Sequence, residues 1–191
     1  MHASLCDQLA DLVQNALEAG ATRVTLRVAE TAGRLDVAVG DNGCGMSEAV
    51  QARALDPFYS DGRKHRHRRM GLGLAFLRQM VEATGGGLEL QSAVGTGTDV
   101  RFWLDAGHVD MPPMGDWGAT LTGMMAFPGD YELEVERRRG DQGYRVRRSE
   151  LIEALGELET AMSLAMARDY VASQEEALMM RKGQGHGSTD T

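Results

Sequence analysis

The sequence predicts an α+β fold, because segments of helical periodicity stand next to pairs of segments in which every second residue is apolar. The members of each pair are separated by a short glycine-containing stretch, which is typical of β-hairpins. Of the 191 residues, 42% are hydrophobic and 25% are charged, as in ordinary globular proteins. We therefore expect hairpin-paired strands together with amphipathic helices.

The first expected elements are a helix and a hairpin. Apolar residues recur at helical spacing over 5–17, and the glycine of "EAGA" ends this helix. Two half-buried strands are expected at 24–28 and 35–39, because apolar residues alternate there with polar ones. The segment "AETAG" joins them, so we expect a hairpin.

A loop, a short helix and a basic segment follow. After "DNGCGM" (41–46), Ser47 is a suitable N-cap for a helix that continues to about Leu55, and Pro57 closes it. Residues 56–70 are expected to be irregular, and they contain the basic run "RKHRHRR".

A second helix and hairpin complete this half of the chain. The segment "GLGLAFLRQMVEAT" (71–84) predicts a glycine-led helix that "GGG" ends. The strands "LELQSA" and "TDVRFWL" then flank the turn "VGTG".

The second half is expected to begin near Asp105, where "AGHVDMPPMGDWG" supplies two prolines and several glycines. Three short strands are expected beyond it, at 119–126, 131–137 and 143–148. Ser149 is expected to cap a helical stretch that reaches about Arg181 and that Gly156 interrupts. The division of the chain that follows is a main domain at 1–105, a linker at 106–118, a small strand and helix segment at 119–182 and a disordered tail at 183–191.

Composition limits the classes of protein to which the chain can belong. No apolar run approaches the roughly 18 residues of a membrane span, and "MHASLCDQLADLVQ" lacks the regions of a signal peptide. With only Cys6 and Cys44, a disulfide framework is not expected. The net charge of −8 argues against a surface built for nucleic acid. We therefore expect a cytoplasmic protein that contacts no membrane.

Two polar patterns are ambiguous when each is taken alone. Asp11 and Asn15 share the helix face opposite the apolar stripe, which also suits a plain solvated face. Gly71 and Gly73 open a helix whose free N–H groups suit phosphate oxygens, but many helices begin with glycine. The chain has no P-loop motif, and "GLG" follows a basic segment rather than a strand, which excludes a Rossmann site.

Two loops are also ambiguous between a structural and a ligand-binding role. "DNGCGM" ends a strand with a carboxylate and two glycines, which suits either an ordinary turn or a ligand held against bare backbone. "VGTGT" (94–98) suits a hairpin loop, and its Thr98 begins a strand expected beside the one that ends at Asp41. This arrangement would place a hydroxyl next to the carboxylate.

The four motifs occur in an order that resembles a known superfamily. "DLVQNALEAGAT", "DNGCGM", "DPFYSD" with "MGLGL", and "GTGT" resemble the N, G1, lid-plus-G2 and G3 boxes of the Bergerat-fold ATPases, which include gyrase, heat-shock chaperones, histidine kinases and MutL. The resemblance covers about 5–104, and the first box looks most like that of MutL. It implies a two-layer sandwich in which a mixed, mostly antiparallel sheet carries helices on one face and binds ATP.

The resemblance also implies roles for individual residues. Asp41 would accept a hydrogen bond from the adenine amine, with Thr98 and a water beside it, while Gly43 and Gly45 let the base approach the backbone. Asn15 would bind Mg²⁺ through its amide oxygen.

Further implied contacts involve the second helix and the segment before it. Gly71, Leu72 and Gly73 would offer N–H groups to the phosphates, under a mobile, basic lid at 56–70. The remaining nucleotide-binding residues implied by the motifs are Met46, Met70 and Leu74.

The first box departs from the pattern of gyrase, MutL and the chaperones at Asp11, where they have a glutamate that activates water. The side chain is one methylene shorter, so we expect slow Mg²⁺-dependent hydrolysis in an ATP-controlled switch. Only about ten residues precede this box, so no dimerisation hairpin with a phospho-acceptor histidine is expected before it. Three alternatives stay open: a protein kinase acting in trans, a binding-only regulator, and a nucleic-acid binder that uses 63–69. A protein partner is expected to dock on 106–182.

Overall fold

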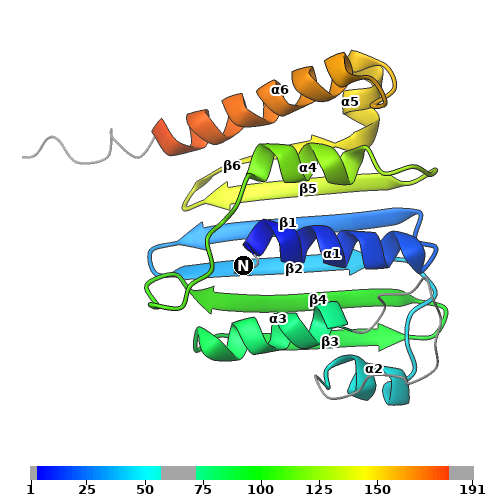
Figure 1. Ribbon diagram of the computed structural model, residues 1–191, viewed down its shortest axis with the longest axis vertical. Helices are drawn as coiled ribbons and strands as arrows, with labels where there is room; N and C mark the ends of the chain where they lie inside the picture. Colours follow the sequence, from blue (N-terminus) through cyan, green and yellow to red (C-terminus); the bar gives the residue numbers. More distant parts are fainter. Residues whose placement is uncertain (1–3, 57–71, 181–191) are drawn as a thin grey trace, which may run out of the picture.

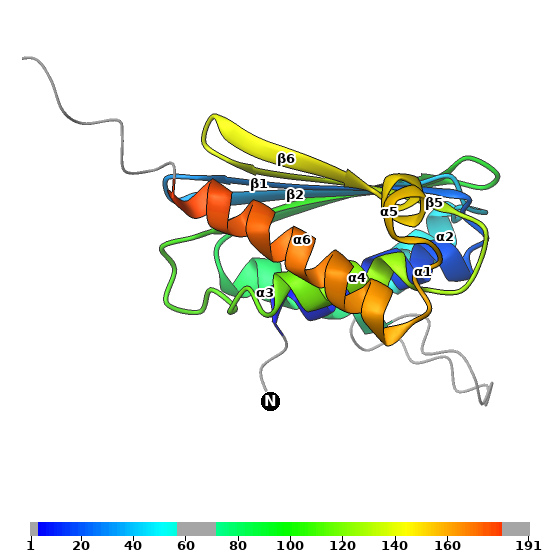
Figure 2. The ribbon, with the colours of Figure 1, turned by 90° about the horizontal axis from the view of Figure 1, so that it is seen from above.

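The computed structural model describes residues 4–56 and 72–180 and forms two layers, a six-stranded sheet and a layer of helices on one of its faces (Figures 1 and 2). The strand order is β3-β4-β2-β1-β5-β6, and only β1 and β5 pair in parallel. The predicted fold class, a mixed and mostly antiparallel sheet with helices on one face, is therefore confirmed.

The elements have the following bounds. The strands are β1 (Arg23–Thr31), β2 (Arg34–Asp41), β3 (Gly87–Ala93), β4 (Gly97–Asp105), β5 (Glu132–Arg139) and β6 (Gln142–Arg147). The helices are α1 (Leu5–Glu18), α2 (Glu48–Ala54), α3 (Leu72–Ala83), α4 (Trp117–Met125), α5 (Arg148–Leu155) and α6 (Ala161–Met180).

Helix α1 follows from its first residues and its apolar stripe. The Ser4 hydroxyl accepts a hydrogen bond from the Asp7 N–H at 3.2 Å, and the Asp7 carboxylate accepts one from the Ser4 N–H at 2.8 Å, which completes a capping box. Leu5, Leu9 and Leu12 recur at helical spacing and are buried in the hydrophobic core. The predicted helix and the hairpin of β1 and β2 are confirmed.

The sheet has one apolar and one polar face because side chains alternate along each strand. Val24, Leu26 and Val28 of β1 are fully buried, whereas Arg27 between them is exposed. Figure 2 shows α1, α3, α4 and α6 on one side of the sheet and an uncovered face on the other. The core therefore lies between the helices and the inward-facing apolar side chains of the strands.

The strand predicted at 119–126 is wrong, since this segment lies within and just after helix α4. Asp116 caps the helix by accepting a hydrogen bond from the Ala119 N–H at 2.9 Å. Leu121, Met124 and Met125 are buried at helical spacing, and α4 packs beside α1. A short apolar run suits a strand or a buried helix equally well, so packing against α1 decides between them.

The C-terminal helices differ from the expectation at one end. The N-cap residue of α5 is Arg147, so the predicted cap at Ser149 is wrong. The interruption at Gly156 is confirmed, because this residue has φ +78° and α5 ends at Leu155. Helix α6 then continues to Met180. Of the predicted lid at 56–70, all but residue 56 lies outside the described residues, as does the predicted tail at 183–191.

Strands β5 and β6 extend the sheet of the first half. Leu133 of β5 pairs with Val24 of β1, and β6 pairs with β5 on the outer side. Segment 119–180 therefore shares one sheet and one core with the N-terminal segment, and its role as a docking module stays a prediction.

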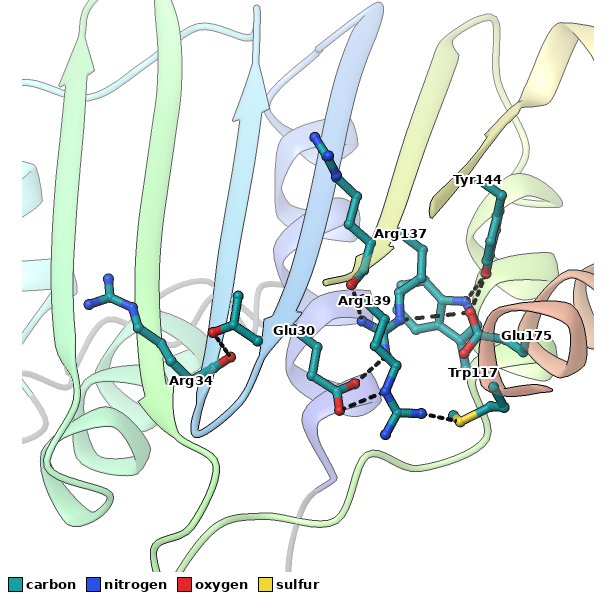
Figure 3. Close-up of polar contacts among 10 residues, drawn as sticks. Glu30, Arg34, Trp117, Arg137, Arg139, Tyr144 and Glu175 are labelled. Atoms are coloured by element: carbon teal, nitrogen blue, oxygen red, sulfur yellow. Dashed lines mark hydrogen bonds and ion pairs between the residues drawn. The ribbon is translucent and has the colours of Figure 1, made fainter. Parts of the chain in front are cut away.

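A buried polar network attaches the C-terminal elements (Figure 3). The Arg137 side chain is only 2% exposed, and its guanidinium lies 2.9 Å from Glu30 and 3.7 Å from Glu175. The Tyr144 hydroxyl donates to Glu175 at 2.6 Å and accepts from the Trp117 indole N–H at 2.6 Å. Burial and the Glu175 carboxylate hold the pKa of Tyr144 above its ordinary value. The network joins β1, β5, β6, α4 and α6.

Replacing Arg137 with methionine should lower the free energy of unfolding by about 3 kcal/mol. The change keeps most of the side-chain volume but leaves two carboxylates without their shared cation, and breaking a buried ion pair costs roughly 3–5 kcal/mol. We expect the lower end because Glu30 and Glu175 keep 26% and 19% exposure. The control Arg138→Met removes an arginine that is 54% exposed and should cost less than about 1 kcal/mol. Equal costs in urea denaturation would contradict the role of the network.

Candidate functional site

Polar side chains gather at the end of the sheet where β2 finishes. Asp41, the last residue of β2, pairs in register with Thr98 of β4, which in turn pairs with Ser92 of β3. Asp41 and Thr98 lie two positions from the inward-facing residues Val39 and Val100, and Ser92 pairs with Thr98, so the three side chains face the helix layer. The prediction that the strand beginning at Thr98 lies beside the strand that ends at Asp41 is confirmed.

Ser92 connects this cluster to the loop that follows β2. Its hydroxyl accepts a hydrogen bond from the Met46 N–H at 2.8 Å and donates to the Gly97 carbonyl oxygen at 2.9 Å. The same Oγ atom lies 3.0 Å from the Thr98 hydroxyl oxygen. The loop at 41–46 and the β3–β4 turn are thereby held as one unit.

The Asp41 carboxylate is half-buried, and its environment favours the neutral form. Burial raises its pKa, and the hydrogen bonds that it accepts from the Gly43 and Thr98 N–H groups offset this only in part. The bond from Gly43 measures 2.7 Å. Asp41 is therefore a strong acceptor held at a site that penalises its charge.

The two loop glycines are required by contacts within the chain itself. A Cβ at Gly43 would lie 3.0 Å from the carbonyl oxygen of Ala19. Gly45 has φ +63°, and a Cβ there would collide with the carbonyl group of Ala93. These contacts explain both glycines without a ligand, so their contact with a base stays a prediction.

Helix α1 presents Asp11 and Asn15 to the beginning of α3. A Cβ at Gly73 would lie 3.4 Å from Asn15 Nδ2 and 4.0 Å from Asp11 Oδ2. The first turn of α3, where N–H groups have no partner within the helix, thus lies against the polar face of α1. Leu74 packs on the core, Leu72 begins the helix, and the predicted residues Met70 and Gly71 lie outside the described range.

The C-terminal ends of α1 and β2 lie at the same end of the molecule as the start of α3 (Figure 1). The Cys44 N–H donates to the Ala19 carbonyl oxygen at 2.9 Å, which seats the loop after Asp41 against the C-terminal end of α1. Asn15 lies one helical turn before Ala19, so the Asn15 amide, which lies beside the start of α3, is at the same end of α1 as the loop that follows Asp41.

Sequence reasoning missed three residues that shape this region. Asn42 accepts hydrogen bonds from the Thr22 and Arg23 N–H groups at 3.0 and 2.8 Å. Gln51 donates to the carbonyl oxygens of Met46 and Ser92 at 3.1 and 2.7 Å. The sequence does carry a signal for Ser92, because this residue continues the inward-facing positions of Leu88 and Leu90 along β3. No comparable pattern in the sequence indicates the role of Gln51.

Comparison with known proteins gives the family. The model for the histidine kinase-, DNA gyrase B- and HSP90-like ATPases matches residues 3–108, so the chain belongs to this family. The sensor histidine kinase AruS of Pseudomonas aeruginosa is 38% identical over 105 residues, which are 51% of this chain and 10% of AruS. A putative sensor protein of Shewanella frigidimarina is 33% identical over 97 residues, 49% of this chain and 14% of that protein. The chain thus spans a small part of the length of these curated relatives.

A solved structure is also similar in part. The catalytic domain of the histidine kinase ThkA is 24% identical, covers 51% of this chain and 63% of its own, and superposes with a TM-score of 0.40. Family membership confirms the resemblance of residues 5–104 to the ATPase superfamily, and nucleotide binding is expected of such a domain. The likeness of the first box to MutL stays a prediction.

The described residues contain no group of three or more His, Cys, Asp or Glu side chains able to hold a metal ion. An ion bound through Asn15 and the oxygens of a nucleotide would not need such a group. None of the helices in the described part of the chain is long and apolar enough to cross a membrane.

The shifted pKa of Asp41 predicts a pH-dependent stability in the absence of nucleotide. The folded state raises the pKa of Asp41. The contribution of Asp41 to the stability of the fold is therefore fully present below the ordinary carboxyl pKa of about 3.9, and it is lost as pH rises through the higher pKa of the folded state. Asp41→Asn keeps an oxygen for the Gly43 N–H without the charge. We expect its Tm to equal or exceed that of the wild type at pH 7.5, and this advantage should disappear near pH 3.5. A larger Tm loss at pH 7.5 than at pH 3.5 would contradict the assignment.

Proposed function

We propose that this protein is an ATP-controlled conformational switch that hydrolyses ATP slowly with Mg²⁺. The observation that supports this best is the in-register pair of Asp41 and Thr98 at one end of the sheet, with Asp11 and Asn15 facing the first turn of α3 at the same end. A purine nucleoside triphosphate requires hydrogen-bond acceptors for its base, and a polar helix face with free N–H groups for its phosphates.

Each residue has a role in the proposal. Asp41 accepts a hydrogen bond from the exocyclic amine of adenine, and Thr98 and a water complete that edge. The Gly73 N–H, with those of Gly71 and Leu72, binds phosphate oxygens. Family members carry their nucleotide with a divalent ion, and the Asn15 amide oxygen is a hard ligand that suits Mg²⁺, which would neutralise phosphate charge there.

Asp11 is the proposed general base. It lies one helical turn before Asn15 on the same face, and from this position its carboxylate would take a proton from the water that attacks the terminal phosphate. Its side chain is short, and a misplacement of about 1 Å can cost on the order of 100-fold in rate. Slow turnover follows, which suits a switch whose state depends on the bound nucleotide.

A second candidate is phosphoryl transfer to a separate protein. The named relatives, which include sensor histidine kinases, favour it. Either activity would be linked to a protein partner through 106–182, a segment most of which lies outside the family match. In our proposal the protein acts in the cytoplasm and uses neither membrane nor nucleic acid. Incubation with γ-labelled ATP would leave label on a partner protein in the case of transfer and only in free phosphate in the case of hydrolysis.

Three substitutions on α1 should separate hydrolysis from binding. Asp11→Asn keeps size and position, so it should abolish phosphate release while ATP affinity stays within a few-fold. Asn15→Ala removes the magnesium ligand and should reduce both turnover and the Mg²⁺-dependent part of the affinity. Asp11→Glu restores reach and should raise turnover. Phosphate release and calorimetric titration with ATP and ADP, with and without Mg²⁺, measure these effects.

Gln14→Ala is the matched control for this series. Gln14 lies on the same helix and is exposed, and its side-chain amide donates a hydrogen bond to Glu18 at 2.9 Å. The substitution should change neither the rate of phosphate release nor the ATP affinity. If neither the wild type nor Asp11→Glu releases phosphate, hydrolysis is excluded. Transfer or binding alone would then explain the site.

A further inference from the structure

The direction of the hydrogen bonds around Ser92 determines what Thr98 can offer to a ligand. A serine hydroxyl has one proton and two lone pairs. The Gly97 carbonyl oxygen can only accept, so its 2.9 Å bond uses the Ser92 proton. The Met46 N–H can only donate, so its 2.8 Å bond uses one lone pair of the serine oxygen.

One lone pair of Ser92 then remains for Thr98. Because the Ser92 proton is already engaged, the 3.0 Å contact between the two hydroxyl oxygens requires that Thr98 be the donor. The Thr98 proton therefore points toward Ser92, and the free side of its oxygen presents lone pairs. Asp41, directly across in the register, presents carboxylate oxygens as well. The end of the site is thus lined by two acceptors.

We propose that Ser92 is a positioning residue that fixes the Thr98 hydroxyl as an acceptor and so makes the site select a purine with an exocyclic amine over one with a carbonyl. This inference rests on the proposed nucleotide site and specifies its base. Adenine offers an N–H₂ group at position 6, which two acceptors bind. Hypoxanthine has an oxygen at that position, which two acceptors repel. The pair ATP and inosine triphosphate therefore tests the proposal with one change of functional group.

Removal of the Ser92 hydroxyl should relax this selection. In Ser92→Ala the Thr98 hydroxyl is free to rotate and donate to a carbonyl, so inosine triphosphate gains a hydrogen bond that the wild type denies it. A neutral hydrogen bond corresponds to a change of about three- to tenfold in binding. We expect the ratio of the Kd for inosine triphosphate to the Kd for ATP to fall by this factor.

The ratio separates positioning from a purely structural role. Ser92 also holds Met46, so its loss could loosen the loop, but a loosened loop weakens both nucleotides equally and leaves the ratio unchanged. Ser92→Thr keeps a hydroxyl and should preserve the wild-type ratio. Gln91→Ala changes the exposed neighbour on the opposite face of β3 and should also preserve it.

Calorimetric titration of the full chain with each nucleotide and Mg²⁺ provides the measurement, with circular dichroism to check folding. If Ser92→Ala does not fold, Ser92→Cys keeps a side chain of similar size with weaker hydrogen bonds and should shift the ratio in the same direction. If the wild type prefers ATP and Ser92→Ala leaves the ratio of the two Kd values unchanged, the positioning role of Ser92 is overturned, while the proposed nucleotide site is not. A wild type that binds neither nucleotide would overturn the proposed function, and this inference with it.

Discussion

The register between β2 and β4 determines where the polar end of this sheet lies. Val39 and Val100 pair across these strands and are buried under the helices, so Asp41 and Thr98, two positions further along, must face the same side. A slip of one residue in either strand would expose the valine of that strand and turn its polar residue to the uncovered face. The apolar core therefore places the two polar residues on the same face of the sheet, and the hydrogen bond from the Thr98 N–H to the Asp41 carboxylate adds to this arrangement.

Helix α1 brings core and site together in one element. Its apolar side is buried on the sheet, while Asp11 and Asn15 lie on the side that meets α3. The capping box at Ser4 fixes where the helix begins, and the contact of the Ala19 carbonyl with Cys44 fixes its other end against the loop after β2. Side chains on a packed helix and at a strand end are held more rigidly than those on loops, as a nucleotide site requires.

The second half of the chain is joined to the first by β1. This strand pairs with β2 on one side and with β5 on the other. Val24, near its start, lies across from Asp41, whereas Glu30, near its end, contacts the buried Arg137. The polar network that fastens α4 and α6 is thus separated from the site by most of a strand, roughly 20 Å at 3.3 Å per residue. A partner bound to the C-terminal helices would reach the nucleotide region through β1, or through the packing of α4 on α1.

Sequence alone determined α1, both hairpins of the first half and the proximity of Asp41 to Thr98, because these depend on periodicity and turn residues within short stretches. The order of the four motifs in the sequence also indicated the ATPase superfamily, to which the chain belongs. Tertiary structure alone decided that 117–125 is a helix, that β5 joins β1 in parallel, and that Ser92 links two loops. The physical reason is that each of these depends on which distant segment supplies a partner: α1 for the apolar run of α4, a free strand edge for β5, and the Met46 N–H for a serine hydroxyl that could otherwise bond to water.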